Sequence, residues 1–247
     1  MTNYTKFWDL YRKILKYSHI RKDESEFIKS LLDDFKKNNI EVPKFLVDIG
    51  CGDGRVSGFI AKKKKFKEVF LVDESSSVNL AKDRFNLLNV KLNVFQVNLK
   101  DYLKNIKEDS LVLAVGAINF FPNQHKILKQ LISKKPKIII LAVTGYGFLG
   151  SIYMGLNILR KSSFISHQIG IFLNLLNRNI KYSGKPNSLK RYFYTLLVKL
   201  IEPFVASKIY RLSLKDYKFF FEKNNYKIYK NKELGLCRWI VLIRKTI

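Results

Sequence analysis

Cysteine and acidic side chains are scarce in this 247-residue chain, and each scarcity excludes a class of protein. The two cysteines, Cys51 and Cys237, lie far apart and form no CxxC pair. We therefore expect no disulfide framework, no metal site and a reducing compartment. The first 26 residues lack a long apolar run, because a charge recurs every few positions. This excludes a signal-peptide core, and we expect a cytoplasmic location.

Only 20 Asp and Glu oppose 46 Lys and Arg, which gives a formal charge of +26 at pH 7. A bias toward Lys, Asn, Ile and Phe explains part of the excess, but such a bias would raise Glu together with Lys. We therefore interpret the charge as a preference for an anionic partner: nucleic acid, a phosphorylated small substrate or a membrane surface. A hydrophobic content of 47% excludes a chain that is disordered throughout.

Apolar residues at helical spacing predict helices over residues 1–40, the second beginning near Asp23 and ending at Asn38. Beyond Pro43, short apolar runs alternate with helical patterns, which predicts a parallel sheet. Two later runs flank a polar turn with Gly235 and predict an antiparallel hairpin. The predicted strands are 45–50, 68–73, 92–97, 110–116 and 137–143, each buried on both faces, and the hairpin strands are 226–230 and 237–245.

Residues 146–215 form a segment of different composition, aromatic and helical in pattern, with 11 Lys and Arg against the single acid Glu202. We predict a lid inserted between the fifth strand and the hairpin, where substrate specificity would lie. Its interleaved basic and aromatic residues suit stacking on bases, an amphipathic contact with a membrane, or a lid over a phosphorylated or lipid-like acceptor. The same residues would also form a helix with a buried aromatic face and a solvated basic face.

One uncharged stretch, residues 138–159, is long enough to cross a bilayer. Gly145, Gly147 and Gly150 cluster in its middle, where a strand would end in a loop. We therefore predict a buried strand followed by a loop rather than a transmembrane helix. A peripheral contact of the following helices with a membrane is a further hypothesis.

The strongest local signal is VDIGCGDGRVSGFIA, residues 47–61. A predicted strand runs into Gly50, Gly52 and Gly54, which permit a tight turn and let a ligand approach the backbone. The amides of the following helix face the same space. Asp73, at the end of the second strand, is placed to accept hydrogen bonds from both hydroxyls of a ribose. Because Arg55 replaces the third glycine of the nicotinamide fingerprint, a different nucleoside cofactor is predicted.

DIGCGDG resembles the first motif of the class I S-adenosylmethionine-dependent methyltransferases, particularly the small-molecule type. The resemblance covers about residues 40–145 and, more loosely, 213–247. It implies an α/β fold with a Rossmann-like seven-stranded methyltransferase sheet, mostly parallel, with a C-terminal antiparallel hairpin and a helical lid insertion. The implied domains are N-terminal helices over 1–40, a cofactor-binding core over 41–145, the insertion over 146–215 and a closing part over 216–247.

The resemblance also implies S-adenosyl-L-methionine as cofactor. The glycine loop would lie against its methionine part, Asp73 would bind the ribose and Asp48 would steady the loop. The cofactor-binding residues implied in this way are Asp48, Gly50, Cys51, Gly52, Gly54, Asp73, Glu74, Asn98, Leu99, Val115 and Gly116.

Asn98 departs from the family pattern, which places an acid there to accept from the adenine amine. An amide oxygen accepts the same hydrogen bond without charge assistance, so a weaker contact is expected. Asp101 would substitute if the alignment is shifted, and its other reading is a helix cap.

The DPPY or NPPY motif of enzymes that methylate base amines is missing, since the matching stretch reads VGAINFF. We therefore predict transfer of a methyl group to an O or N of a small acceptor that is anionic or membrane-associated. Alternatives are an RNA methyltransferase and a non-catalytic cofactor-binding protein. A general base is required only for a protonated acceptor; the candidates are His125, His167 and Tyr146.

Overall fold

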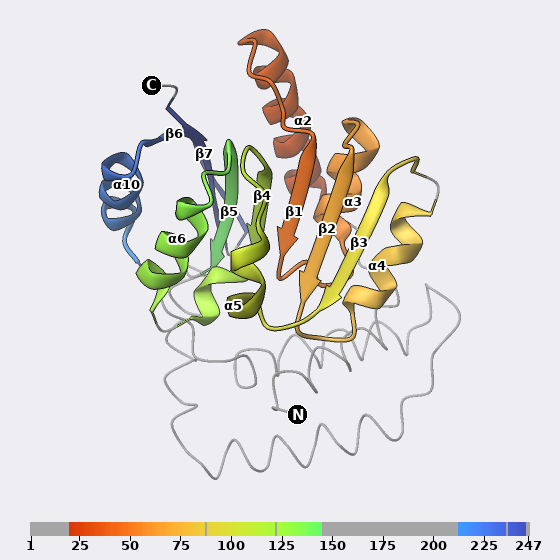
Figure 1. Ribbon diagram of the computed structural model, residues 1–247. Coiled ribbons are helices and arrows are strands. Elements are labelled where there is room, and N and C mark those ends of the chain that lie inside the picture. The colour runs from red at the N-terminus through yellow and green to blue at the C-terminus, as the bar shows by residue number, and fades with distance from the viewer. Residues whose placement is uncertain (1–19, 87, 122, 145–211, 236, 246–247) are drawn as a thin grey trace.

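The computed structural model describes residues 20–86, 88–121, 123–144, 212–235 and 237–245. These residues form one seven-stranded sheet in the order β3-β2-β1-β4-β5-β7-β6 (Figure 1). β1 to β5 are parallel, whereas β7 is antiparallel to both of its neighbours. The strands are β1 Phe45–Ile49, β2 Glu68–Asp73, β3 Lys91–Gln96, β4 Leu111–Val115, β5 Ile138–Thr144, β6 Tyr226–Leu234 and β7 Cys237–Arg244. The predicted Rossmann-like sheet with its closing hairpin is confirmed.

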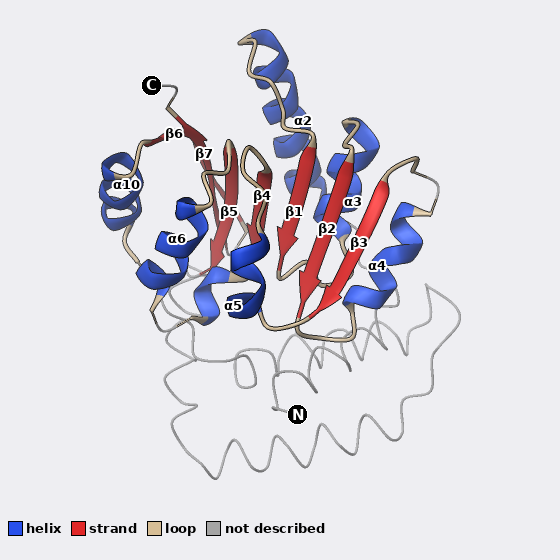
Figure 2. Ribbon diagram, viewed as in Figure 1, coloured by secondary structure: helices blue, strands red, loops and turns tan. Residues whose placement is uncertain are grey.

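Helices cover both faces of the sheet and bury two separate apolar clusters (Figure 2). Leu46 belongs to one cluster and its neighbour Val47 to the other, because successive side chains of a strand point to opposite faces. The first cluster is covered by α2 Lys22–Lys37, α3 Arg55–Lys63 and α4 Val78–Phe85. The second cluster is covered by α5 Leu99–Tyr102, the 3-10 turn η1 Leu103–Asn105, α6 Gln124–Ser133 and α10 Leu214–Lys223.

Helix α2 follows the predicted pattern, with Phe27, Ile28, Leu31 and Phe35 buried against the sheet. It ends where predicted, at Asn38, and Asn39 follows in the left-handed region at φ 53°. The expected helix before it falls in residues 1–19, outside the described residues.

Strand β3 corrects one expectation, that each predicted strand is buried on both faces. None of its side chains is fully buried, because β3 lies at the edge of the sheet and pairs only with β2. Strand β6 is longer than predicted, since its pairing with β7 continues to Leu234 opposite Cys237. Residues 145–211, which hold nearly all of the predicted lid, lie outside the described part of the chain.

The two ends of the parallel strands differ in what they support. We call the end at which β1 to β5 finish the carboxyl edge, and the opposite end the amino edge. The strand order reverses between β1 and β4, so a crevice for ligands is expected at the carboxyl edge beside these strands. The glycine loop after β1 lies at this point (Figure 1).

Candidate active site

The glycine loop, residues 50–54, connects β1 to α3 and contains three glycines in the left-handed backbone conformation. Gly50, Gly52 and Gly54 have φ values of 69°, 56° and 68°, which other residues adopt only with strain. A Cβ on Gly50 would lie 2.5 Å from the Ala117 Cβ. The amides of Gly50 and Cys51 donate to the Val72 carbonyl at 2.8 and 3.1 Å. The loop is therefore tied to the end of β2 by its own backbone.

Asp73 turns its carboxylate toward this loop. Gly52 N donates to Asp73 Oδ2 at 2.7 Å, while the amide and hydroxyl of Ser75 donate to Oδ1 at 2.8 and 2.6 Å. An ionised carboxylate offers about four acceptor sites, so Oδ2 keeps capacity for a further donor. The sequence placed Asp73 beside the loop, but it gave no sign that Ser75 would orient the carboxylate.

Asp48 lies beneath the loop on β1 and is fully buried. Burial raises the pKa of Asp48 to about 7, while a hydrogen bond with Ser57 and the charge of Arg55 act in the opposite direction. The nearby carboxylate of Asp73 raises it further. Asp48 therefore titrates close to neutral pH and anchors the strand end to α3 through Ser57.

Two ion pairs hold the residues on either side of Gly54. Arg84 of α4 donates to the carbonyl oxygen and to Oδ2 of Asp53, both at 2.6 Å. Arg55 donates to both carboxylate oxygens of Glu24 on α2, with an Nη2–Oε1 distance of 3.2 Å. Sequence reasoning missed both partners, because they come from helices 31 residues away in each case.

The end of β4 offers open space opposite the loop. Gly116 has a φ of 72°, and a Cβ built there would meet no atom within 4 Å among the described residues. Val115 beside it is partly exposed. Asn119, which follows in the same stretch, is buried at 1% exposure in the 3-10 turn η2 Ile118–Phe120.

At the end of β3, Asn98 serves as the N-cap of α5, since its side-chain oxygen accepts from Lys100 N at 3.0 Å. Its Nδ2 donates to Glu74 Oε2 at 3.3 Å, which joins the ends of β2 and β3. Leu99 is buried, and Asp101 is exposed within α5 rather than capping it. Asn98 thus fills the capping role considered for Asp101.

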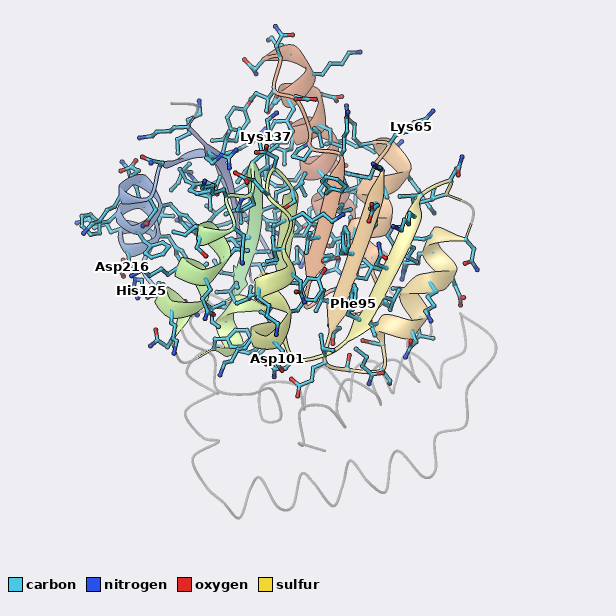
Figure 3. All side chains as sticks on the ribbon, in the orientation of Figure 1. Lys65, Phe95, Asp101, His125, Lys137 and Asp216 are labelled. Atoms are coloured by element: carbon cyan, nitrogen blue, oxygen red, sulfur yellow. The ribbon has the colours of Figure 1, made fainter. Side chains whose placement is uncertain are left out.

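His125 is exposed on the first turn of α6, and its ring centroid lies 5.5 Å from that of Phe220 on α10. Hydrogen bonds with Ser213 hold the pKa of the Asp216 carboxyl below its usual range, and the nearby His125 lowers this pKa slightly further. Figure 3 shows His125 and Asp216 together, away from Asp101 of α5 at the carboxyl edge of the sheet. Tyr146 and His167 lie outside the described residues.

The described part of the chain holds no group of three His, Cys, Asp or Glu side chains that could bind a metal ion. No helix in the same ranges has the length and apolar character needed to cross a bilayer. Residues 138–144 of the uncharged stretch are strand β5, as expected.

Comparison with solved structures identifies the fold. Magnesium protoporphyrin IX methyltransferase from Synechocystis PCC 6803, with bound SAH, superposes with a TM-score of 0.55 at 14% identity, covering 96% of this chain and 94% of that one. The same enzyme with bound SAM gives 0.54 at 12% identity, covering 96% and 90%. A SAM-dependent methyltransferase from Anabaena variabilis gives 0.53 at 14% identity, covering 98% and 94%. At these identities the likeness concerns the fold.

Sequence comparison gives a narrower result. No curated protein matches the chain by sequence. Residues 17–115, which include the glycine loop and Asp73, match the family model described as methyltransferase small domain. Together with the sheet order and the structural neighbours, this match shows that the chain has the fold of the class I S-adenosylmethionine-dependent methyltransferases, whose solved structures include ones with bound SAM or SAH.

Proposed function

We propose that this protein transfers a methyl group from S-adenosylmethionine to an O or N of a small acceptor that is anionic or membrane-associated. The observation that carries the proposal is the carboxylate of Asp73, which faces the glycine loop and keeps capacity on Oδ2. The bound cofactor would supply an activated methyl group on a sulfonium. The chain would then contribute binding, alignment of the acceptor and exclusion of water.

The residues present suit such a cofactor. Asp73, with Glu74 beside it, would accept from the ribose hydroxyls. The backbone of Gly50, Cys51, Gly52 and Gly54 would hold the methionine part, and Asp48 would steady that backbone from below. The open space at Gly116 is where a larger residue would intrude on the cofactor, with Val115 alongside.

The adenine would lie between the ends of β2 and β3. Leu99 would pack against the ring, and the oxygen of Asn98 would accept from the exocyclic amine. This oxygen already accepts from Lys100 N, so the contact with adenine would use its second lone pair. A neutral, shared acceptor there supports a weaker adenine contact than a free carboxylate would give.

Small acceptors are favoured because the fourth strand is followed by VGAINFF rather than DPPY. The neighbour that acts on magnesium protoporphyrin IX, by its name, spans nearly the same length of chain. For an acceptor that must lose a proton, His125 is the candidate base in the described part, with Tyr146 and His167 as the other candidates.

Titration calorimetry with S-adenosylhomocysteine tests the cofactor assignment. We expect binding by the wild-type protein and a loss of about 100-fold in affinity for Asp73→Ala, because two charge-assisted hydrogen bonds are removed. Asp33→Ala, which removes an exposed carboxylate of α2, is the matched control and should bind normally. Absence of binding, or equal binding by Asp73→Ala, would refute the assignment.

Transfer of labelled methyl groups from the cofactor into cell extract tests the acceptor class. The extract is separated into lipid, nucleic-acid and small-molecule pools, and label is expected in the small-molecule or lipid pool. Label in RNA would establish the alternative RNA methyltransferase. Cofactor binding without label in any pool would indicate a non-catalytic binding protein.

A further inference from the structure

Two side chains from neighbouring helices, Glu24 of α2 and Arg84 of α4, contact the residues on either side of Gly54. Three of the five loop residues have a left-handed backbone conformation, which residues other than glycine rarely adopt. The two non-glycine residues that flank Gly54 carry opposite charges, Asp53 before it and Arg55 after it. Each is held by a different helix, so the turn at Gly54 is fixed from two sides.

On the α4 side, Arg84 makes a two-point contact with Asp53. Its Nε donates to the backbone carbonyl and its Nη2 to the carboxylate, so the guanidinium fixes both the main chain and the side chain of one loop residue. The side chains are 1% exposed for Asp53 and 18% for Arg84. At this burial the pair is weakly screened by solvent, and its geometry is specific to a planar guanidinium.

On the α2 side, Glu24 makes the corresponding contact with Arg55. The carboxylate is 5% exposed and accepts from both terminal nitrogens of Arg55, and the backbone amide of Arg21 donates to it at 3.3 Å. Arg55 is the first residue of α3, where a positive charge opposes the helix dipole. Glu24 neutralises this charge and fixes the side chain that starts the helix.

We propose that Glu24 and Arg84 are positioning residues that hold the glycine loop in the conformation that receives the methionine part of the cofactor. This rests on the proposed function. Neither residue is assigned a contact with the cofactor, and both act through the backbone of residues 53–55. The adenosyl part would be held by the ends of β2 and β3, so loosening the loop should affect the two halves of the cofactor unequally.

The test compares two probes, S-adenosylhomocysteine and 5′-methylthioadenosine, which lacks the amino-acid part. Glu24→Gln removes the charge that faces Arg55, and Arg84→Lys keeps the charge but loses the two-point contact. We expect each variant to bind S-adenosylhomocysteine about tenfold more weakly and methylthioadenosine less than about threefold more weakly. A general loss of stability would weaken both probes alike.

The matched control is Asp34→Asn, which removes an ion pair of the same helix α2, with Lys230 of β6 at 2.5 Å. It should leave the affinities for both probes unchanged. Equal weakening of the two probes, unchanged affinity for S-adenosylhomocysteine, or the same effect in Asp34→Asn would each overturn the proposal. If Glu24→Gln does not fold, Arg84→Lys decides the test.

Hydrogen exchange of residues 50–56 gives a second readout that needs no ligand. Faster exchange in Glu24→Gln and Arg84→Lys, with wild-type exchange in Asp34→Asn, is the expected result, and unchanged exchange in the first two would overturn the proposal. If the wild-type protein binds neither probe, the proposed function fails, whereas this measurement still decides whether the two side chains hold the loop.

Discussion

The two edges of the sheet carry opposite kinds of charge. At the carboxyl edge, three acids around the glycine loop are buried or half-buried and each is engaged: Asp48 with Ser57, Asp53 with Arg84, and Asp73 with Gly52 and Ser75. Strained glycines connect them. These three carboxyl groups each have a defined place, as expected where a ligand is to be aligned.

The amino edge is basic and exposed. Figure 3 shows Lys65 and Lys137 at this edge and Asp101 at the other. Its acids are already in ion pairs, such as Glu41 with Lys137 at 2.9 Å and Glu68 with Lys107 at 3.4 Å. A cluster of exposed lysines remains around the starts of β1 and β2, formed by Lys44, Lys62, Lys63, Lys64, Lys65 and Lys67.

This cluster of exposed lysines and the glycine loop lie at opposite edges of the sheet. Within the described residues, the exposed basic cluster lies a full strand length from the glycine loop. We expect substitutions at the carboxyl edge to change stability and cofactor affinity, and those at the amino edge to change only the attraction to polyanions. Four predictions follow this contrast in order of their effect on the free energy of unfolding.

Gly50→Ala should give the largest loss. The new Cβ would lie 2.5 Å from that of Ala117, at a φ of 69°. Overpacking and left-handed strain together should lower the free energy of unfolding by about 3 kcal/mol. Urea denaturation measures it, with Lys63→Ala at the amino edge as a control that changes stability by less than about 0.5 kcal/mol. A loss below about 1 kcal/mol for Gly50→Ala would contradict the tight packing at this edge.

Stability should fall between pH 5 and 7 because of Asp48. Its folded pKa, raised by burial to about 7, lies above the ordinary value of 3.8. Between these values the folded protein keeps a proton that the unfolded chain has lost. Raising the pH therefore costs at most about 1.4 kcal/mol per unit and about 2 kcal/mol between pH 5 and 7, with a further loss of about 0.4 kcal/mol as the titration finishes near pH 8.

Denaturation of the wild type and of Asp48→Asn at pH 5, 6, 7 and 8 checks this expectation. The variant has no group to ionise at position 48 and should show a flatter profile. Parallel profiles for the two proteins would mean that Asp48 does not titrate in this range.

Gly116→Ala should reduce stability only slightly but should clearly weaken the binding of S-adenosylhomocysteine. Its φ of 72° makes the left-handed strain cost about 1 kcal/mol, whereas no described residue lies within 4 Å of the added Cβ. The added methyl group should reduce affinity for S-adenosylhomocysteine about tenfold, measured by calorimetry. Gly235→Ala, at a φ of 60° in the β6–β7 turn, is a control for the left-handed strain and should leave affinity unchanged, although its Cβ would also displace the Arg21 side chain, whose Nη1 lies at 2.6 Å. Normal binding by Gly116→Ala would place the cofactor elsewhere.

Replacing Lys62, Lys63, Lys64 and Lys65 by Gln should have the smallest effect on stability, less than about 0.5 kcal/mol for each exposed site. The variant should elute from heparin at lower salt, because fewer cations contact the polyanion. Its affinity for S-adenosylhomocysteine should equal that of the wild type. A change in that affinity would show that the two edges are coupled.

The sheet was predictable from the sequence because buried strands leave a direct signal. The runs 45–50, 68–73, 110–116 and 137–143 are continuous and apolar, and their observed bounds differ by one residue or none at each end. Gly50, Gly52 and Gly54 marked the loop because left-handed turns require glycine. Asp73 could be placed because parallel strands end at a common edge. The exposure of β3 was missed because an apolar run does not show whether a strand has one neighbour or two.

The side chains that fix the site were not predictable. Glu24 and Arg84 are ordinary charged residues on amphipathic helices, and many lysines and acids of the chain would fit the same pattern. Glu24 pairs with Arg55 and Arg84 pairs with Asp53 because of how α2 and α4 pack beside α3. The spacing of apolar residues in the sequence does not predict this packing. Asn98 was assigned to adenine, and its capping of α5 depends on the loop geometry after β3.

The position of β7 between β5 and β6 bears on how the protein is made. β5 pairs with β4 on one side and with β7 on the other, yet β7 follows β5 by more than 90 residues and is the last strand in the described part of the chain. Until residues 237–244 leave the ribosome, the apolar run of β5 presents an unpaired edge, which is the type of surface that promotes aggregation. Loss of β7 would leave that edge of β5 unpaired among the described strands, so a strand formed late in synthesis protects one formed much earlier.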